Sequence, residues 1–124
     1  LSLKYEAELH LVHTPQPKTV AFAMGAVAGY HIATTMPSAE EVKEAGDKIL
    51  GSGAAIVKEL GQVVAQAHLG EGSPADDIVD YAKTCGADLI VTGRRGLGAV
   101  GGLVLGSTTQ TINHNADCAC LSVV

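Results

Sequence analysis

The chain opens on a stretch whose second half alternates in the manner of a β-strand. In LSLKYEAELHLVHT, Leu9, Leu11 and His13 fall on one face and the residues between them on the other. We therefore expect a strand over 9–14 that follows the last turns of a helix, with His13 as a packed strand-end side chain rather than a catalytic one. Residues 15–37 show no sustained period and predict a long loop.

The longest helical pattern is PSAEEVKEAGDKILGSGAAIVKELG, residues 37–61. Ser38 and Glu41 have the spacing of a capping box at its start, and Gly61 suits its end. Two glycines in its middle weaken it by about 1 kcal/mol each. The apolar stripe that we expect to face the core consists of Val42, Ala45, Ile49, Ile56 and Leu60.

Shorter strand and helix patterns alternate through the rest of the chain. Ser73, Pro74 and Gly86 carry strong start and stop signals for a helix between them. The segments are a strand over 62–70, a helix over 73–86, a buried strand over 87–93, a helix over 107–115 and a strand over 118–124. Alternation of this kind predicts an α/β fold, a parallel sheet with helices on both faces. Because the pattern opens on a helix end, we expect the first βα unit to be missing from this chain.

Composition and charge narrow the class of protein. At 124 residues with 47% hydrophobic and 17% charged residues, we expect a single globular domain over 1–124. The net charge of −5, with the basic residues scattered, argues against a nucleic-acid partner. No apolar run approaches the roughly 20 residues of a membrane helix, and no signal peptide is visible, so we expect a cytoplasmic protein without a membrane partner.

The three cysteines are most simply free thiols. Cys118 and Cys120 share one face of the last strand, where they pack as small apolar side chains. Together with His114 they invite a zinc interpretation, but a fourth ligand is not evident, so we expect no metal site here.

The stretch VTGRRGLGAVGGLVLGST, residues 91–108, holds six of the fifteen glycines. It follows a predicted strand and leads into a predicted helix at Gly106-Ser107, so it lies where open α/β sheets bind ligands. Successive backbone N–H groups and a helix N-terminus together suit an anion, in particular a phosphate group. Arg94 and Arg95 either contact phosphate or are simply solvated.

Three phosphate-binding templates can be compared with this stretch. The Walker A pattern fails because Ser107 stands where its lysine should be. A G-x-G-x-x-G match at Gly96 is weak, because it belongs on the first strand of a βαβ unit and here a single strand follows. The third pattern, Gly93-x₂-Gly96-x₉-Gly106-Ser107, resembles the nucleotide-binding signature of the universal stress protein family.

The resemblance extends beyond the glycines. AELHLVHT is similar to the family's second strand, GSPADDIVDYAKTCGADLIVTGRRG to its segment from third helix to glycine loop, and LGSTTQTINHNADCACLSVV to its closing helix and strand. The resemblance implies a flavodoxin-like, five-stranded parallel sheet in the order 3-2-1-4-5. It also implies ATP, with or without Mg²⁺, at the carboxyl edge of the sheet, a role in stress response, and homodimers formed through the last strand.

The resemblance also implies particular contacts. Phosphate and ribose contacts fall on Gly93, Gly96, Gly106 and Ser107, with Thr108 as a further contact. Positions beside adenine or ribose fall on Thr92 and on Thr14, where the family usually has valine. With Arg94, the candidate binding residues are Thr14, Thr92, Gly93, Arg94, Gly96, Gly106, Ser107 and Thr108.

Three functions remain open at this point. The first is a regulatory protein that binds an adenine nucleotide. Because no positioned base, arginine finger or Walker lysine is visible in the sequence, we expect slow hydrolysis at most and name no catalytic residue. The second is a hydrolase or transferase that uses the same pocket. The third is an interaction module that binds no nucleotide and pairs through CACLSVV.

Overall fold

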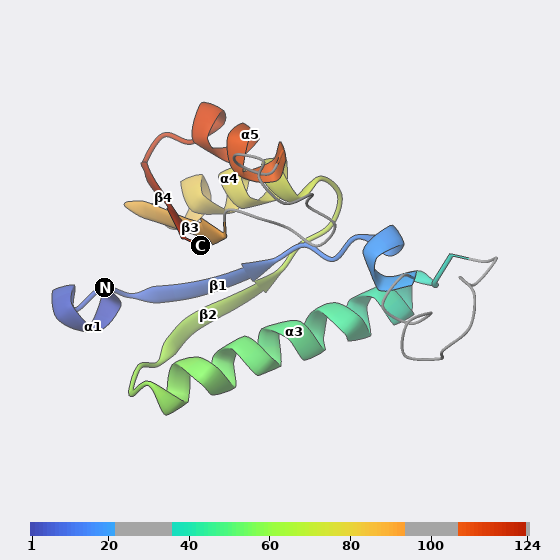
Figure 1. The fold of residues 1–124 in the computed structure, drawn as a ribbon, viewed down its shortest axis with the longest axis horizontal. Coiled ribbons are helices and arrows are strands. Elements are labelled where there is room, and N and C mark those ends of the chain that lie inside the picture. The colour runs from blue at the N-terminus through green and yellow to red at the C-terminus, as the bar shows by residue number, and fades with distance from the viewer. Residues whose placement is uncertain (22–35, 94–106, 124) are drawn as a thin grey trace. The chain divides into compact units, whose positions relative to one another are not determined.

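A computed structural model of the chain describes residues 1–21, 36–93 and 107–123 (Figure 1). These residues form two compact units, Leu1–Glu71 and Gly72–Val124. The strands within each unit are parallel and alternate with helices, which makes the chain an α/β protein. Among the described residues, no helix is long and apolar enough to cross a membrane.

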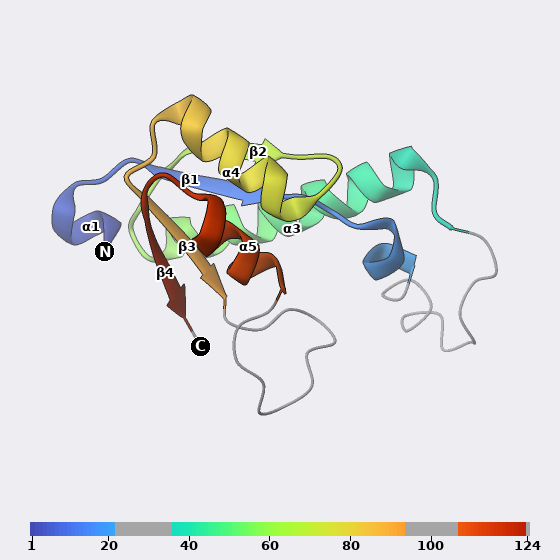
Figure 2. The same ribbon diagram turned by 90° about the horizontal axis from the view of Figure 1, so that it is seen from above.

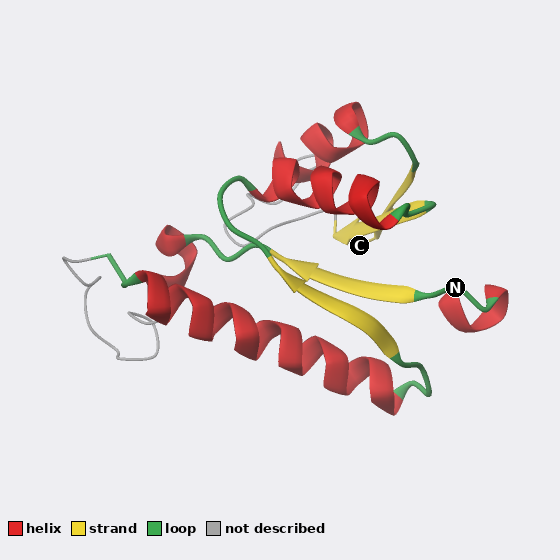
Figure 3. Ribbon diagram, turned by 180° about the vertical axis from the view of Figure 1, so that it is seen from behind, coloured by secondary structure: helices red, strands yellow, loops and turns green. Residues whose placement is uncertain are grey.

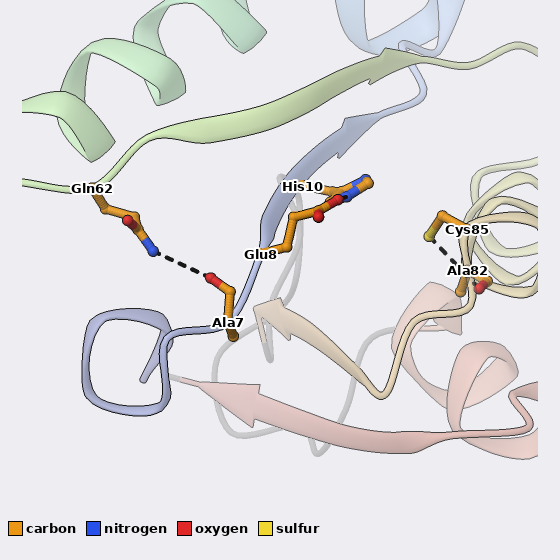
Figure 4. Close-up of polar contacts among 6 residues, drawn as sticks. All are labelled: Ala7, Glu8, His10, Gln62, Ala82 and Cys85. Carbon is orange, nitrogen blue, oxygen red and sulfur yellow. Dashed lines mark hydrogen bonds and ion pairs between the residues drawn. The ribbon is translucent and has the colours of Figure 1, made fainter.

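The first unit is a pair of strands with a long helix along one face. Its elements are α1 (Ser2–Tyr5), β1 (Leu9–His13), α3 (Ala39–Glu59) and β2 (Val64–Leu69). β1 and β2 are parallel neighbours, and α3 lies along them in both Figure 1 and Figure 3. The Gln62 side chain donates from the turn after α3 to the Ala7 carbonyl at 3.4 Å, which ties that turn to the segment before β1 (Figure 4).

The ends of α3 form as the sequence predicts. The Glu41 N–H donates to the Ser38 hydroxyl, and the Ser38 N–H to the Glu41 carboxylate, both at 3.2 Å, so the capping box is complete. At the other end Gly61 has φ +83°, and its N–H donates to the Lys58 carbonyl at 3.0 Å. The helix is unbroken across its two central glycines, because strong caps and contacts with the strands outweigh their weak propensity.

The face that α3 buries differs from the predicted stripe. Val42 and Ala45 are half-buried, but Ile49, Ile56 and Leu60 are 53%, 58% and 69% exposed. Instead Gly46 and Leu50 are buried. Glycine on the inner side lets the helix approach the strands closely: a Cβ at Gly46 would overlap the Leu69 side chain and lie 2.9 Å from the Pro15 ring. The prediction for the last three stripe positions was therefore wrong.

The long loop predicted over 15–37 is corrected at residues 17–21, whereas residues 22–35 lie outside the described residues. Residues 17–21 are helical, with the Val20 N–H donating to the Gln16 carbonyl at 3.0 Å. Val20 and Ala21 are buried, so this turn contributes to the core of the first unit. Its apolar residues are too few to show a period by themselves, and contacts within the fold decide its conformation.

The second unit packs two helices on two strands. Its elements are α4 (Pro74–Cys85), β3 (Leu89–Gly93), α5 (Ser107–Asn115) and β4 (Ala119–Val123), as the sequence predicts. α4 and α5 are in contact, and β3 and β4 are parallel neighbours (Figure 2). Gly86 ends α4 with φ +69°, a left-handed conformation that glycine adopts without strain. The core of this unit consists of Ala75, Val79, Ala82, Ile90 and Ile112.

Strand β3, predicted as a buried strand, is covered on one face among the described residues. Ile90 and Thr92 belong to the covered face, whereas Leu89 and Val91 are 42% and 52% exposed. The run ADLIVTG has no polar alternation that would distinguish a half-covered strand from a fully buried one.

Candidate functional site

Four of the predicted binding residues lie at the ends of two consecutive elements. Thr92 and Gly93 are the last residues of β3, and Ser107 and Thr108 are the first residues of α5. Thr92 is half-buried on the covered face of the strand, whereas the other three are exposed. The structure thus places the strand end and the helix start in one unit, with the hydroxyl groups of Ser107 and Thr108 accessible.

One hydrogen bond joins these two ends. The buried hydroxyl of Thr109, in the first turn of α5, donates to the Gly93 carbonyl at 3.0 Å. Because the two residues are sixteen positions apart, this bond holds the end of the strand beside the start of the helix.

Ser107 and Thr108 line a cleft of about 260 Å³ between the starts of α4 and α5. Small-molecule pockets are usually at least about 300 Å³, so this cleft suits a phosphate-sized group rather than a whole nucleotide. The first N–H groups of a helix have no partner within the helix, and α5 presents such groups at this cleft. The cleft is lined by Ser73, Pro74, Ala75, Asp76, Ser107, Thr108 and Thr111.

The opposite wall of the cleft is the start of α4. Ser73 is the N-cap, as predicted, but its side chain makes no capping hydrogen bond. Asp76 lies in the first turn, where the partial positive charge of a helix start stabilises a carboxylate. The same carboxylate lowers the attraction of the cleft for an anion.

The remaining predicted residues are not part of this group. Thr14 belongs to the first unit, where it directly follows β1 and is only 6% exposed. Arg94, Gly96 and Gly106 lie outside the described residues.

A second cavity of about 260 Å³ lies at the other end of α4 and includes none of the predicted residues. The exposed Lys83–Asp117 pair beside it, at 3.6 Å, adds little stability.

Burial, together with the nearby Cys120 and Asp117, raises the pKa of the Cys118 thiol. The three cysteines are free, and the Cys85 thiol donates to the Ala82 carbonyl at 3.7 Å (Figure 4). In the described part of the chain no cluster of three His, Cys, Asp or Glu could hold a metal.

Sequence reasoning missed two features of this region. Thr109 follows two predicted contacts directly, yet its bond to Gly93 depends on how β3 and α5 pack. The second feature, the contribution of α4 to the cleft, could have been predicted from the sequence. Ser73-Pro74 and Gly106-Ser107 both mark helix starts that follow strands, and such helix starts lie at the same edge of a parallel sheet.

Comparison with known proteins identifies the class of protein. The sequence model of the "Universal stress protein family" matches residues 1–123, so the chain belongs to this family. Universal stress protein YxiE of Bacillus subtilis is 36% identical over 83 residues, which are 67% of this chain and 55% of that protein. A universal stress protein of Thermus aquaticus is 51% identical over 53 residues, 43% of this chain and 39% of that protein. The chain therefore spans about half or less of the length of these relatives.

Solved structures show the same fold. A universal stress protein of Archaeoglobus fulgidus in complex with dAMP superposes with a TM-score of 0.66 at 19% identity, over 99% of this chain and 78% of that chain. A universal stress protein in complex with cAMP superposes with a TM-score of 0.55 at 20% identity, over 98% and 77%.

Proposed function

We propose that this chain binds an adenine nucleotide, with ATP as the expected ligand, and acts as a regulatory protein in stress response. The observation that carries the proposal is the placement of Ser107 and Thr108 at an exposed helix start that lines a cleft. The next residue, Thr109, bonds this helix start to the Gly93 carbonyl at the end of β3. Phosphate groups bind well at such helix starts. The complexes of two structural neighbours with dAMP and with cAMP favour an adenine nucleotide in particular.

The proposed site contains more than these residues. Thr14, Thr92, Arg94, Gly96 and Gly106 complete it in the proposal, and Mg²⁺ accompanies ATP where three phosphates need neutralising. The proposal treats residues 1–124 as one domain, in keeping with the extent of the family match. It also includes the strand order 3-2-1-4-5, in which the pairs β1-β2 and β3-β4 stand for strands 2-3 and 4-5.

The proposal includes a cytoplasmic homodimer formed through β4. In the described part of the second unit, β4 pairs with β3 on one side only, which leaves its other edge available to a second copy. Light scattering on the purified chain gives the molar mass in solution, and a mass equal to that of one chain at all concentrations contradicts the dimer.

The nucleotide proposal is tested by analysing the protein as purified and by titration. The protein is denatured, and any released nucleotide is identified by mass spectrometry. ATP, dAMP and cAMP are then titrated into the emptied protein by calorimetry. We expect saturable binding of ATP. Phosphate release measured over hours separates a regulatory protein, which retains ATP, from a hydrolase, which turns it over.

A pair of glycine variants locates the site. Gly106→Val should abolish ATP binding, because a branched side chain would block backbone approach at the start of α5. Gly51→Val, at an exposed glycine of α3 with no neighbour within 4 Å of an added Cβ, should leave binding unchanged. Equal affinity of Gly106→Val and the unmodified chain would remove this region as the site, and no binding of any of the three nucleotides would refute the function.

A further inference from the structure

The Thr109 hydroxyl makes a bond that its position in the chain does not require. Thr109 is only 6% exposed, and its hydroxyl donates to the carbonyl of Gly93, the last residue of β3, at 3.0 Å. Its backbone lies in the first turn of α5. The bond therefore connects two elements of the second unit, not two residues of one helix.

Other threonines in the helices of this unit behave differently. The Thr84 hydroxyl donates to the Asp80 carbonyl at 2.9 Å, and the Thr111 hydroxyl to the Ser107 carbonyl at 3.0 Å. Both are bonds to the residue four positions earlier, the usual choice of a helical threonine, and both are exposed. Thr109 alone among these three reaches a strand, and it does so in a part-buried setting, where water competes less for the bond.

The two ends that Thr109 joins are the two ends that carry the predicted contacts. Gly93 is itself one of them, and Ser107 and Thr108 directly precede Thr109 in the chain. A hydrogen bond between the strand end and the helix turn fixes the separation of these groups. Ligand groups must be held within about 0.5 Å of their productive positions to bind well.

We propose that Thr109 is a positioning residue of the nucleotide site, which acts by holding Gly93 at a set distance from Ser107 and Thr108. The inference rests on the proposed function, because the groups it positions are the proposed nucleotide contacts. Because Thr109 is only 6% exposed, it acts in this proposal through Gly93 rather than by contact with the nucleotide.

The test uses substitutions that differ by the hydroxyl group. Thr109→Val keeps the shape and removes the donor, and it should raise the Kd for ATP about tenfold, the effect of losing one well-made hydrogen bond. Thr109→Ser keeps the donor and should stay within about threefold of the unmodified chain. If Thr109→Val does not fold, Thr109→Ala is compared with Thr109→Ser, since both lack the methyl group and only one has the hydroxyl.

Two controls separate positioning from general loosening. Thr84→Val removes a hydroxyl whose bond stays within α4, and Ile112→Val opens a small cavity in the core beside Thr109 on α5; both should leave the Kd unchanged. A Kd for Thr109→Val equal to that of the unmodified chain overturns the inference, as does an equal loss of affinity in Ile112→Val. If the unmodified chain itself binds neither ATP, dAMP nor cAMP, the proposed function fails first and the inference falls with it.

Discussion

Single glycines decide how α3 lies on its strands. A Cβ added at Gly46 would meet Pro15 and Leu69, and one added at Gly53 would lie 3.3 Å from Leu11, so at these two positions the helix has little room for a side chain. Gly51 has no such neighbour. Gly46 and Gly51, five positions apart in one helix, therefore have different effects. Gly46 allows close packing, whereas Gly51 only lowers the helix propensity.

The two glycines should respond in opposite directions to alanine. Gly46→Ala should destabilise the protein by about 1 kcal/mol, because overpacking against the Pro15 ring outweighs the gain in helix propensity. Gly51→Ala should stabilise it by about 0.5–1 kcal/mol, because the propensity gain meets no clash. Urea unfolding followed by circular dichroism measures both, and a stabilised Gly46→Ala variant would contradict the close approach.

The elements owe their boundaries to local sequence signals. The capping box at Ser38 and Glu41 starts α3, and the left-handed Gly86 ends α4, both as the sequence predicts. The faces that these elements bury do not follow as readily. Ile49, Ile56 and Leu60 form a sound helical stripe in the sequence, yet they lie on the exposed side of α3. The inner side of α3 carries Gly46 and Leu50 instead, and Gly46 lies too close to Pro15 and Leu69 for a larger side chain.

The capping box gives a prediction at the scale of one element. Ser38→Ala removes the oxygen that accepts from the Glu41 N–H and should cost about 1 kcal/mol of stability. Ser52→Ala, in the exposed middle of the same helix, should be neutral or slightly stabilising because alanine has the higher helix propensity. The two variants are compared by thermal unfolding, and equal melting temperatures would contradict a stabilising role for the cap.

At the scale of the whole molecule, the described residues form two compact units, each with one pair of parallel strands, and the family match extends over both. His13 is the last residue of β1 in the first unit, and its carbonyl accepts from the Gly70 N–H at 2.8 Å. Burial of its ring lowers the pKa of His13 below its ordinary value of 6.5. Protonation of this side chain is therefore coupled to unfolding.

Stability should accordingly depend on pH near neutrality. Because the folded pKa of His13 lies below the unfolded one, its contribution is complete above about pH 6.5 and is lost as the pH falls from there towards the folded pKa. The loss of stability between about pH 7.5 and about pH 5.5 should be smaller in His13→Gln than in the unmodified chain. His114→Gln, at an exposed position in α5, provides the control. The same pH slope in all three proteins would show that His13 is not linked to folding.

The sequence by itself determined the α/β class, the order of the elements, their caps and the glycine signature, because these depend on periodicity and on turn residues within a few positions of one another. Only the tertiary structure decided which face of α3 is buried, that β3 is covered on one side, that residues 17–21 are helical, and that Thr109 donates to Gly93. Each of these depends on how closely two elements approach, and that distance is a property of residues far apart in the chain.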